Sequence, residues 1–332
     1  MKGLILCAGK GSRLYPFTLN HPKTLIPVAN TPILQSCIEK LTEQGIVEIG
    51  IVIHSSQESL IREQFGLGES MGVIITYIYQ NEARGVSDAV KQAQAFIGQE
   101  AFLLLLGDNL ISDRLTELKM DVEERGSQAS LLLAEVAKPQ EYGIAEVWDN
   151  RIVKLEEKPR SPLTKLAVLG AYAFHSSIFE AVNSIVPSAR GEYEITDAIQ
   201  WLIDHNLPVT YHVTEKHNMD VGTMERWLEA NRNMLDEGSG SSKVMIHQNV
   251  ILDNCIIVEP VSIDRNCVLK DCKIGPYVSI STGSHIENCE LENCIILSGV
   301  HLKHIAHSLK DTIIGYRSVI AGLRVMEEVK DN

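Results

Sequence analysis

The hydrophobic pattern of the first two-thirds of the chain alternates between strand-like and helix-like segments. Short, dense apolar runs predict strands, and longer stretches with apolar residues every three or four positions predict helices. The predicted strands are 4–7, 49–53, 73–79, 102–106, 129–135, 152–156, 171–174 and 209–212. The predicted helices are 33–44, 59–64, 86–96, 196–205 and 224–235. This alternation predicts an α/β domain with a mainly parallel sheet over residues 1–235.

A different pattern fills the last quarter of the chain. Large aliphatic residues recur there at steps of five or six positions, at Ile246, Leu252, Val258, Ile263, Leu269, Ile274, Ile280, Ile286, Leu291 and Leu297. Polar cassettes that end in Cys255, Cys272 and Cys289 lie 17 residues apart, close to three hexads. A hexad repeat that closes after three sides predicts a parallel β-helix over residues 244–322, with the cysteines in a column. A β-sandwich with coincidental spacing is the alternative.

A polar segment rich in glycine and serine separates the two patterns. It covers residues 236–243 and is the predicted linker between two domains. Residues 323–332 are the predicted tail.

Composition narrows the classes of partner. The chain has 332 residues, of which 45% are hydrophobic and 22% charged, and its formal net charge is −13. Such a charge argues against nucleic acid or an anionic membrane as the main partner. No apolar run approaches the roughly 20 residues of a membrane span, and the N-terminus enters a strand at once, so we expect a cytoplasmic location. The seven cysteines include no C-x-x-C pair, so neither a disulfide framework nor a zinc site is expected.

The first predicted strand leads into a glycine-rich loop that carries cations. Lys10 and Arg13 lie in this loop, and Lys23 follows between two prolines. Backbone N–H groups of such a loop, together with cations, neutralise a phosphate chain. The loop lacks the pattern GxxxxGK[ST], and it departs from GxGxxG because Leu14 replaces the third glycine. We therefore predict a nucleotide polyphosphate site of another kind.

Two aspartates stand where a divalent cation could be held. Asp108 follows the apolar run 102–106, and Asp220 precedes the helix predicted from residue 224. Two carboxylates from separate loops suit Mg²⁺ (magnesium), which keeps waters and binds phosphates. An ordinary Asp-Asn turn and a helix N-terminal acid are the structural alternatives.

Residues 3–33 resemble the signature of the sugar-phosphate nucleotidyltransferases, GGxGTRLxPxTxxxPKxLxPVxxKP. Ala8, Ser12 and Thr31 depart from it. Further segments resemble motifs of the same family: Tyr142-Gly143, Glu156-Glu157-Lys158-Pro159, residues 168–172 and residues 190–197. The resemblance covers nearly the whole chain and is strongest to the long form of the glucose-1-phosphate thymidylyltransferases. It implies a Rossmann-like nucleotidyltransferase domain followed by a left-handed parallel β-helix.

The resemblance also implies roles for individual residues. Arg13 would stabilise the leaving pyrophosphate, and Lys23 would hold the α-phosphate and the sugar phosphate. The implied nucleotide-binding residues are Leu6, Ala8, Gly9, Gly11, Ser12, Gln80, Gly85 and Asp108. The implied sugar-phosphate-binding residues are Gly143, Glu157, Lys158, Val168, Tyr172 and Arg190. Asp108 and Asp220 would hold Mg²⁺.

The reaction implied is the condensation of a nucleoside triphosphate, dTTP favoured, with glucose 1-phosphate to give a nucleotide sugar and pyrophosphate. Thr24 and Asp88 depart from the thymidylyltransferase pattern, so UTP, ATP or GTP with another sugar 1-phosphate remains open. A non-catalytic regulatory or scaffold subunit and an acyltransferase in the second domain are further alternatives. We expect a homo-oligomer, because β-helix neighbours often associate.

Overall fold

The computed structural model describes residues 1–9, 11–216, 218–237 and 243–322. Its contacts divide the chain into two compact units. The first unit comprises Met1–Ser12, Thr18–Leu25 and Ile33–Asp220, and the second comprises Arg13–Phe17, Ile26–Pro32 and Val221–Asn332. Lys10, most of the expected linker and the expected tail lie outside the described residues. The domain boundaries expected from the sequence remain a prediction.

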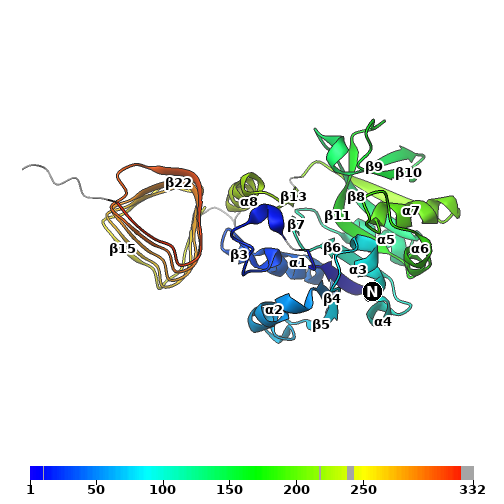
Figure 1. Cartoon of the computed structure of the whole chain (residues 1–332), viewed down its shortest axis with the longest axis horizontal. Helices are drawn as coiled ribbons and strands as arrows, with labels where there is room; N and C mark the ends of the chain where they lie inside the picture. The colour runs from blue at the N-terminus through cyan, green and yellow to red at the C-terminus, as the bar shows by residue number, and fades with distance from the viewer. Residues whose placement is uncertain (10, 217, 238–242, 323–332) are drawn as a thin grey trace, which may run out of the picture. The chain divides into compact units, whose positions relative to one another are not determined.

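A nine-stranded sheet forms the centre of the first unit, with its path running β10-β9-β11-β6-β1-β4-β5 (Figure 1). Four strands at one side are parallel, namely β6 (Phe102–Leu106), β1 (Lys2–Leu6), β4 (Glu48–Ile53) and β5 (Ile74–Tyr79). On the other side β11 (Leu166–Phe174) pairs antiparallel with β6, with β9 (Gly143–Trp148) and with β8 (Ala129–Glu135). β10 (Arg151–Glu157) pairs antiparallel with β9, and β12 (Val209–Thr214) pairs parallel with β8.

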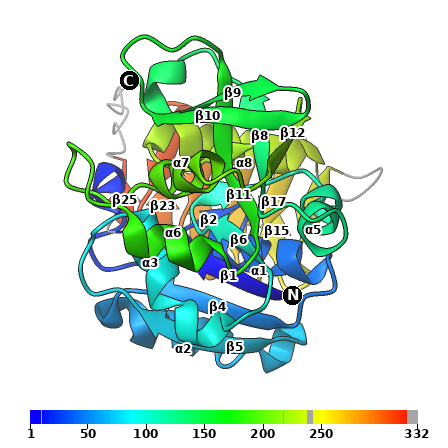
Figure 2. The same cartoon turned by 90° about the vertical axis from the view of Figure 1, so that its right-hand side faces the viewer.

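Helices pack against this sheet through their apolar positions. The helices of the first unit are α1 (Ile33–Thr42), α2 (Glu58–Phe65), α3 (Val86–Gln92), α4 (Gln94–Ile97), α5 (Thr116–Glu123), α6 (Ile178–Ser184) and α7 (Ile195–Asp204). Figure 2 shows α3, α6 and α7 in front of the central strands, and their buried residues share one core cluster with β1, β6, β8 and β11. Burial of this apolar surface, rather than helix propensity, holds such short helices in place.

The fold confirms the α/β prediction and adds elements that the hydrophobic pattern did not predict. β9, α5 and α6 are new, and β11 begins at Leu166 instead of residue 171. The helix expected over residues 86–96 is divided into α3 and α4 at Ala93. The remaining predicted strands and helices of the first unit are confirmed to within about two residues at most ends.

The second unit contains a series of parallel strands, consistent with a left-handed β-helix (Figure 1). The strands are β14 (Val244–Ile246), β15 (Ile251–Asp253), β16 (Ile256–Ile257), β17 (Val261–Ile263), β18 (Val268–Lys270), β19 (Lys273–Ile274), β20 (Val278–Ile280), β21 (His285–Glu287), β22 (Glu290–Ile296), β23 (His301–Lys303), β24 (Leu309–Ile314) and β25 (Val319–Ala321). Equivalent aliphatic residues stack from coil to coil, as in the ladder Leu252, Leu269, Ile286, Leu302.

The cysteine column expected from the cassettes is present. The Ile256 N–H donates to the Cys272 carbonyl (2.8 Å), and the Lys273 N–H donates to the Cys289 carbonyl (3.0 Å). Cys272 and Cys289 are buried, and burial raises the pKa of both thiols, to about 11 for Cys272. These cysteines therefore act as small neutral core residues.

Segments outside the β-helix also belong to the second unit. Helix α8 (Met224–Glu237) places the fully buried Asn231 so that its Oδ1 accepts from the Ala29 N–H (2.9 Å) and the Ser279 hydroxyl (2.8 Å). Ala29 and Asn30 form the left-handed turn between β2 (Pro27–Val28) and β3 (Thr31–Pro32). This turn, which follows the signature cation Lys23 along the chain, is thus hydrogen-bonded to the β-helix.

Candidate active site

The glycine-rich loop begins at the carboxyl end of β1, where ligands bind in open α/β sheets. Gly11 has a φ of 63°, and its carbonyl accepts from the Thr18 hydroxyl (2.7 Å). A Cβ added to Gly11 would lie only 2.9 Å from the Lys23 Cβ. A glycine is therefore required both by the backbone conformation and by the close packing of the loop on Lys23.

Lys23 is the centre of the charged cluster. Its side chain is 8% exposed, and its Nζ donates to Asp108 Oδ2 at 2.6 Å and to Asp220 Oδ1 at 3.4 Å. A buried ammonium is stable only when carboxylates of this kind compensate its charge. The structure thus brings together three residues that are far apart in the sequence and that were predicted to act together.

Backbone pairing positions the two aspartates. Asp108 lies in the turn between β6 and β7 (Asn109–Leu110), and Asp220 ends β13 (Met219–Asp220). β7 and β13 pair antiparallel, with Asp220 opposite Asn109. This pairing explains why carboxylates 112 positions apart meet one ammonium.

Asn109 holds the Asp108 side chain in place. Its amide nitrogen donates to Asp108 Oδ1 (3.0 Å), and its amide oxygen accepts from the Gly170 N–H (3.1 Å). A Cβ on Gly170 would lie 2.0 Å from this amide, so any larger residue there would displace it. The turn after β6 is thereby fixed to β11.

The residues present fit a divalent cation. Among the residues that the structure describes, no group of three or more His, Cys, Asp and Glu side chains forms a metal site. Mg²⁺ commonly takes one or two protein carboxylates and completes its shell with waters and substrate phosphates. Asp108 and Asp220 converge on one cation, the Lys23 ammonium, and would supply those two carboxylates.

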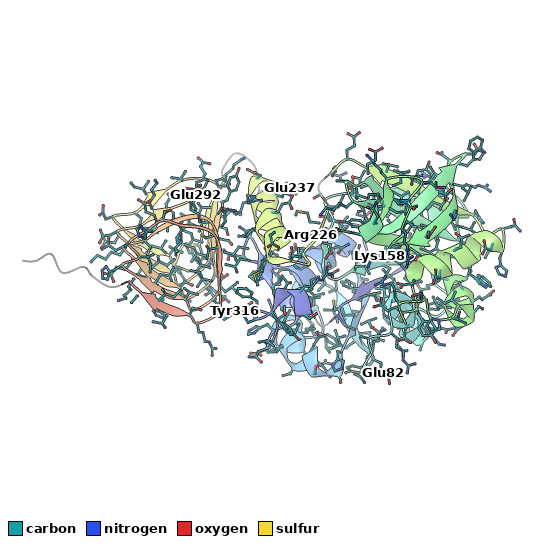
Figure 3. The ribbon with its side chains drawn as sticks, turned by 45° about the horizontal axis from the view of Figure 1, so that its top comes forward. Glu82, Lys158, Arg226, Glu237, Glu292 and Tyr316 are labelled. Carbon is teal, nitrogen blue, oxygen red and sulfur yellow. The ribbon has the colours of Figure 1, made fainter. Side chains whose placement is uncertain are left out.

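A second polar cluster surrounds Glu157, at the end of β10. Glu157 Oε1 accepts from Arg190 (3.3 Å) and lies 3.7 Å from the Lys158 Nζ, and Glu157 Oε2 accepts from the Thr196 hydroxyl (3.3 Å). Lys158, labelled in Figure 3, is half-exposed, as is Arg190. The cluster offers an oriented acceptor beside two cations, as a sugar phosphate requires.

The other predicted sugar residues line the same place. A Cβ on Gly143 would lie 3.1 Å from Glu157 Oε2 and 3.9 Å from Val168. Burial, followed by the charges of Glu157 and Asp108, raises the pKa of Tyr172 far above its usual value. Tyr172 therefore stays neutral, and it lies near enough to both carboxylates for their charges to act on it.

A third cluster lies at the carboxyl end of β5. Gln80 is buried there, its N–H donates to the Ile53 carbonyl (2.9 Å), and its Nε2 donates to the Gly85 carbonyl (3.1 Å). Gly85 has a φ of 104°, and a Cβ would lie 2.6 Å from the Tyr193 carbonyl oxygen. Gln80 and Gly85, both expected at the base, are thus adjacent.

The remaining nucleotide residues follow β1. Leu6 and Ala8 are half-buried, whereas Gly9 and Ser12 are exposed. Arg13 is exposed in η1 (Ser12–Leu14) and belongs to the second unit, so its role remains a prediction.

Sequence reasoning missed two contributors, Asn109 and Thr196, which contact the carboxylates, and it named Asp88 without its contact with Gln80. The motifs around Asn109 and Thr196 were visible, but only the fold shows which carboxylate each side chain reaches.

The family model for nucleotidyl transferases matches residues 2–237. The chain belongs to this family. One relative is the low-salt glycan biosynthesis nucleotidyltransferase Agl11 of Haloferax volcanii, 39% identical over 257 residues, which are 77% of this chain and 72% of that protein. Another is a glucose-1-phosphate thymidylyltransferase of Streptomyces griseus, 35% identical over 78% of this chain and 73% of that protein.

A solved structure extends the similarity to three dimensions. It is a candidate glucose-1-phosphate thymidylyltransferase from Bacillus anthracis in complex with sucrose, 32% identical, with a TM-score of 0.67 over 73% of this chain and 98% of that one. Family membership and these relatives support sugar-phosphate nucleotidyltransferase activity. No helix of the described residues has the length and apolarity to span a bilayer.

Proposed function

We propose that the protein condenses a nucleoside triphosphate, dTTP by preference, with glucose 1-phosphate, and releases pyrophosphate. An oxygen of the sugar phosphate attacks the α-phosphorus and forms the new P–O bond. The bond from the α-phosphorus to the bridging oxygen breaks, and pyrophosphate leaves with the electron pair. The attacking oxygen is already anionic, so the reaction needs no general base.

The contact of Lys23 with Asp108 and Asp220 carries the proposal. A buried ammonium between two carboxylates, next to a glycine loop, is suited to hold an α-phosphate and a second phosphate together. A divalent metal, when bound by Asp108 and Asp220, supplies positive charge that offsets repulsion between the phosphates. Arg13 would meet the charge that develops on pyrophosphate.

The cluster around Glu157 would bind the sugar phosphate. Lys158 and Arg190 supply positive charge for the phosphate, and Glu157 accepts from sugar hydroxyls. Neutral Tyr172 and Val168 form the apolar wall beside them.

The preference for dTTP rests on similarity and on Gln80. The Streptomyces griseus relative is a thymidylyltransferase, but a UTP–glucose-1-phosphate uridylyltransferase of Haloferax volcanii is 32% identical over 71% of this chain. Uracil and thymine present the same hydrogen-bonding edge, so UTP is the second candidate.

The test is pyrophosphate release with Mg²⁺ and glucose 1-phosphate, comparing dTTP, UTP, ATP and GTP. We expect dTTP to be used best, and Asp108→Asn to lower kcat at least about 100-fold. Asp149→Asn makes the same chemical change at an exposed turn between β9 and β10 and should have no effect.

Other results would distinguish the alternatives. Better use of another triphosphate would support the same reaction but overturn the proposed preference for thymine. No release from folded protein with any triphosphate or sugar phosphate would refute the proposal and favour a regulatory role.

A further inference from the structure

The side-chain amide of Gln80 is held in one orientation. Its Nε2 donates to Asp88 Oδ2 at 2.7 Å and to the Gly85 carbonyl at 3.1 Å. A carboxylate and a carbonyl are both acceptors, so only the NH₂ group of the amide can meet them. Both N–H bonds are therefore used, and Oε1 is the polar atom left for a ligand.

Asp88 is itself firmly positioned. It lies in the first turn of α3, next to Ser87, which is 1% exposed. The Ser87 hydroxyl donates to the Glu194 carbonyl (2.8 Å), and the Ser87 N–H donates to the Tyr193 carbonyl (3.0 Å). Rotating the Gln80 amide by half a turn would place its oxygen against the Asp88 carboxylate and exchange a charge-assisted bond for repulsion.

Gln80 also lies at the edge of the sheet that carries the glycine loop. β5, β4 and β1 are neighbouring parallel strands, and Gln80 follows β5 as the loop follows β1. Gln57, after β4, donates from Nε2 to the Gly9 carbonyl (3.4 Å). A ligand whose phosphates meet the glycine loop can therefore present its base near Gln80.

We propose that Asp88 is a positioning residue for base selection, because it fixes Gln80 so that Oε1 faces the base as an acceptor. The proposal rests on the proposed function, in which Gln80 contacts the base. Thymine and uracil carry a hydrogen at ring nitrogen N3, which an acceptor binds. Cytosine has a lone pair at N3, which an acceptor repels, so the locked amide favours dTTP over dCTP.

The experiment compares kcat/KM for dTTP and dCTP, which differ in hydrogen bonding at the edge in question. In Asp88→Ala only the Gly85 carbonyl still holds the amide nitrogen, so the amide rotates more readily and can donate to cytosine N3, and the dTTP:dCTP ratio should fall about tenfold or more. Asp88→Asn retains an acceptor oxygen and should keep the ratio within about threefold. A merely structural role would lower both rates together and leave the ratio unchanged.

Glu82→Gln is the matched control. Glu82, labelled in Figure 3, belongs to the same loop, and its side chain is 68% exposed. It forms an ion pair with Arg84. Glu82→Gln should leave the dTTP:dCTP ratio of kcat/KM as it is in the parent.

The two proposals fail differently. A parent enzyme that uses dCTP as well as dTTP, or a folded Asp88→Ala variant with the parental ratio, would overturn the role of Asp88. Absence of pyrophosphate release from every triphosphate would refute the proposed function instead. The affinities of dTTP and dCTP for the parent and for Asp88→Ala, measured by calorimetry, would then still decide whether the fixed Gln80 amide selects the base.

Discussion

Replacing Asn30 tests whether the turn between β2 and β3 is held by the β-helix. The Asn30 Nδ2 donates to the Ser262 hydroxyl (2.9 Å) and carbonyl (3.1 Å) and to the Ile280 carbonyl (3.1 Å). Its Oδ1 accepts from the Ser281 hydroxyl (3.0 Å). One amide therefore connects the turn to two neighbouring coils.

The cost of Asn30→Ala follows from these contacts. The two carbonyls keep a second lone pair for the coil ladder, whereas the nearly buried hydroxyls of Ser262 and Ser281 each lose a partner. At about 1 kcal/mol for each hydroxyl, the lost hydrogen bonds amount to roughly 2 kcal/mol. Asn30 also has a φ of 68°, where alanine costs about 1 kcal/mol more. We expect a total destabilisation of about 3 kcal/mol.

The assay is thermal unfolding followed by circular dichroism. The melting temperature of Asn30→Ala should fall by roughly 6 to 12 °C. Asn30→Gly loses the same hydrogen bonds without the backbone strain, so its melting temperature should fall by about two-thirds as much. Asn249→Ala, at an exposed turn of the β-helix, is the control. A melting temperature of Asn30→Ala within about 1 °C of the parent would refute the reasoning.

Three further predictions concern the first unit. Lys23→Met should lower kcat for pyrophosphate release at least about 100-fold while Lys23→Arg retains part of it, as steady-state kinetics would show; equal losses would contradict a role for charge. Gly170→Ala should displace the Asn109 amide and lower both the melting temperature and kcat, and an unchanged kcat would contradict this. Burial raises the pKa of Asp121, but hydrogen bonds, including one with His212, outweigh burial and hold it below its usual value, so its contribution to stability is lost as pH falls below about 4. Asp121→Asn should therefore be less stable than the parent in urea at pH 7, and the difference should shrink as the pH is lowered below about 4; a difference independent of pH would refute this.

The hydrophobic pattern predicted those strands and helices whose own sequence is enough to determine their secondary structure. β6 is apolar throughout, and β8 has an apolar centre, 131–134, between Ser130 and Glu135; both were predicted with the bounds observed. β9 begins with Gly143 and contains Glu146, so its pattern is weak, and its pairing with β10 and β11 decides its structure.

Helix α5 was missed because its buried face includes a charge. Asp121 is nearly buried, where its carboxylate accepts from Ser130 (2.7 Å), Thr210 (2.8 Å) and Arg125 (2.8 Å). In a hydrophobic pattern an aspartate counts as a solvent-facing position. The buried face of such a helix is therefore not recognised from the sequence. α6 is short, and its packing against α3 and α7 stabilises it.

The candidate site was predicted motif by motif, and the contacts between motifs were not predictable. Lys23, Asp108 and Asp220 were each identified from local patterns, but their meeting depends on the pairing of β7 with β13. These contacts join residues 85 and 197 positions apart, beyond the reach of any local periodicity.

The segment from Ser188 to α7 shows how one motif can serve two sites. By resemblance, residues 190–197 belong to the sugar site, and Arg190 does contact Glu157. The Tyr193 backbone, however, accepts from the Ser87 N–H (3.0 Å) and donates to the Arg84 carbonyl (2.7 Å), in the loop that carries Gly85. Because both contacts are made by the backbone, the side chain at position 193 does not reveal them. The proposed base and sugar sites therefore share one structural support. Judged by its side chains alone, this motif would be assigned to the sugar site only.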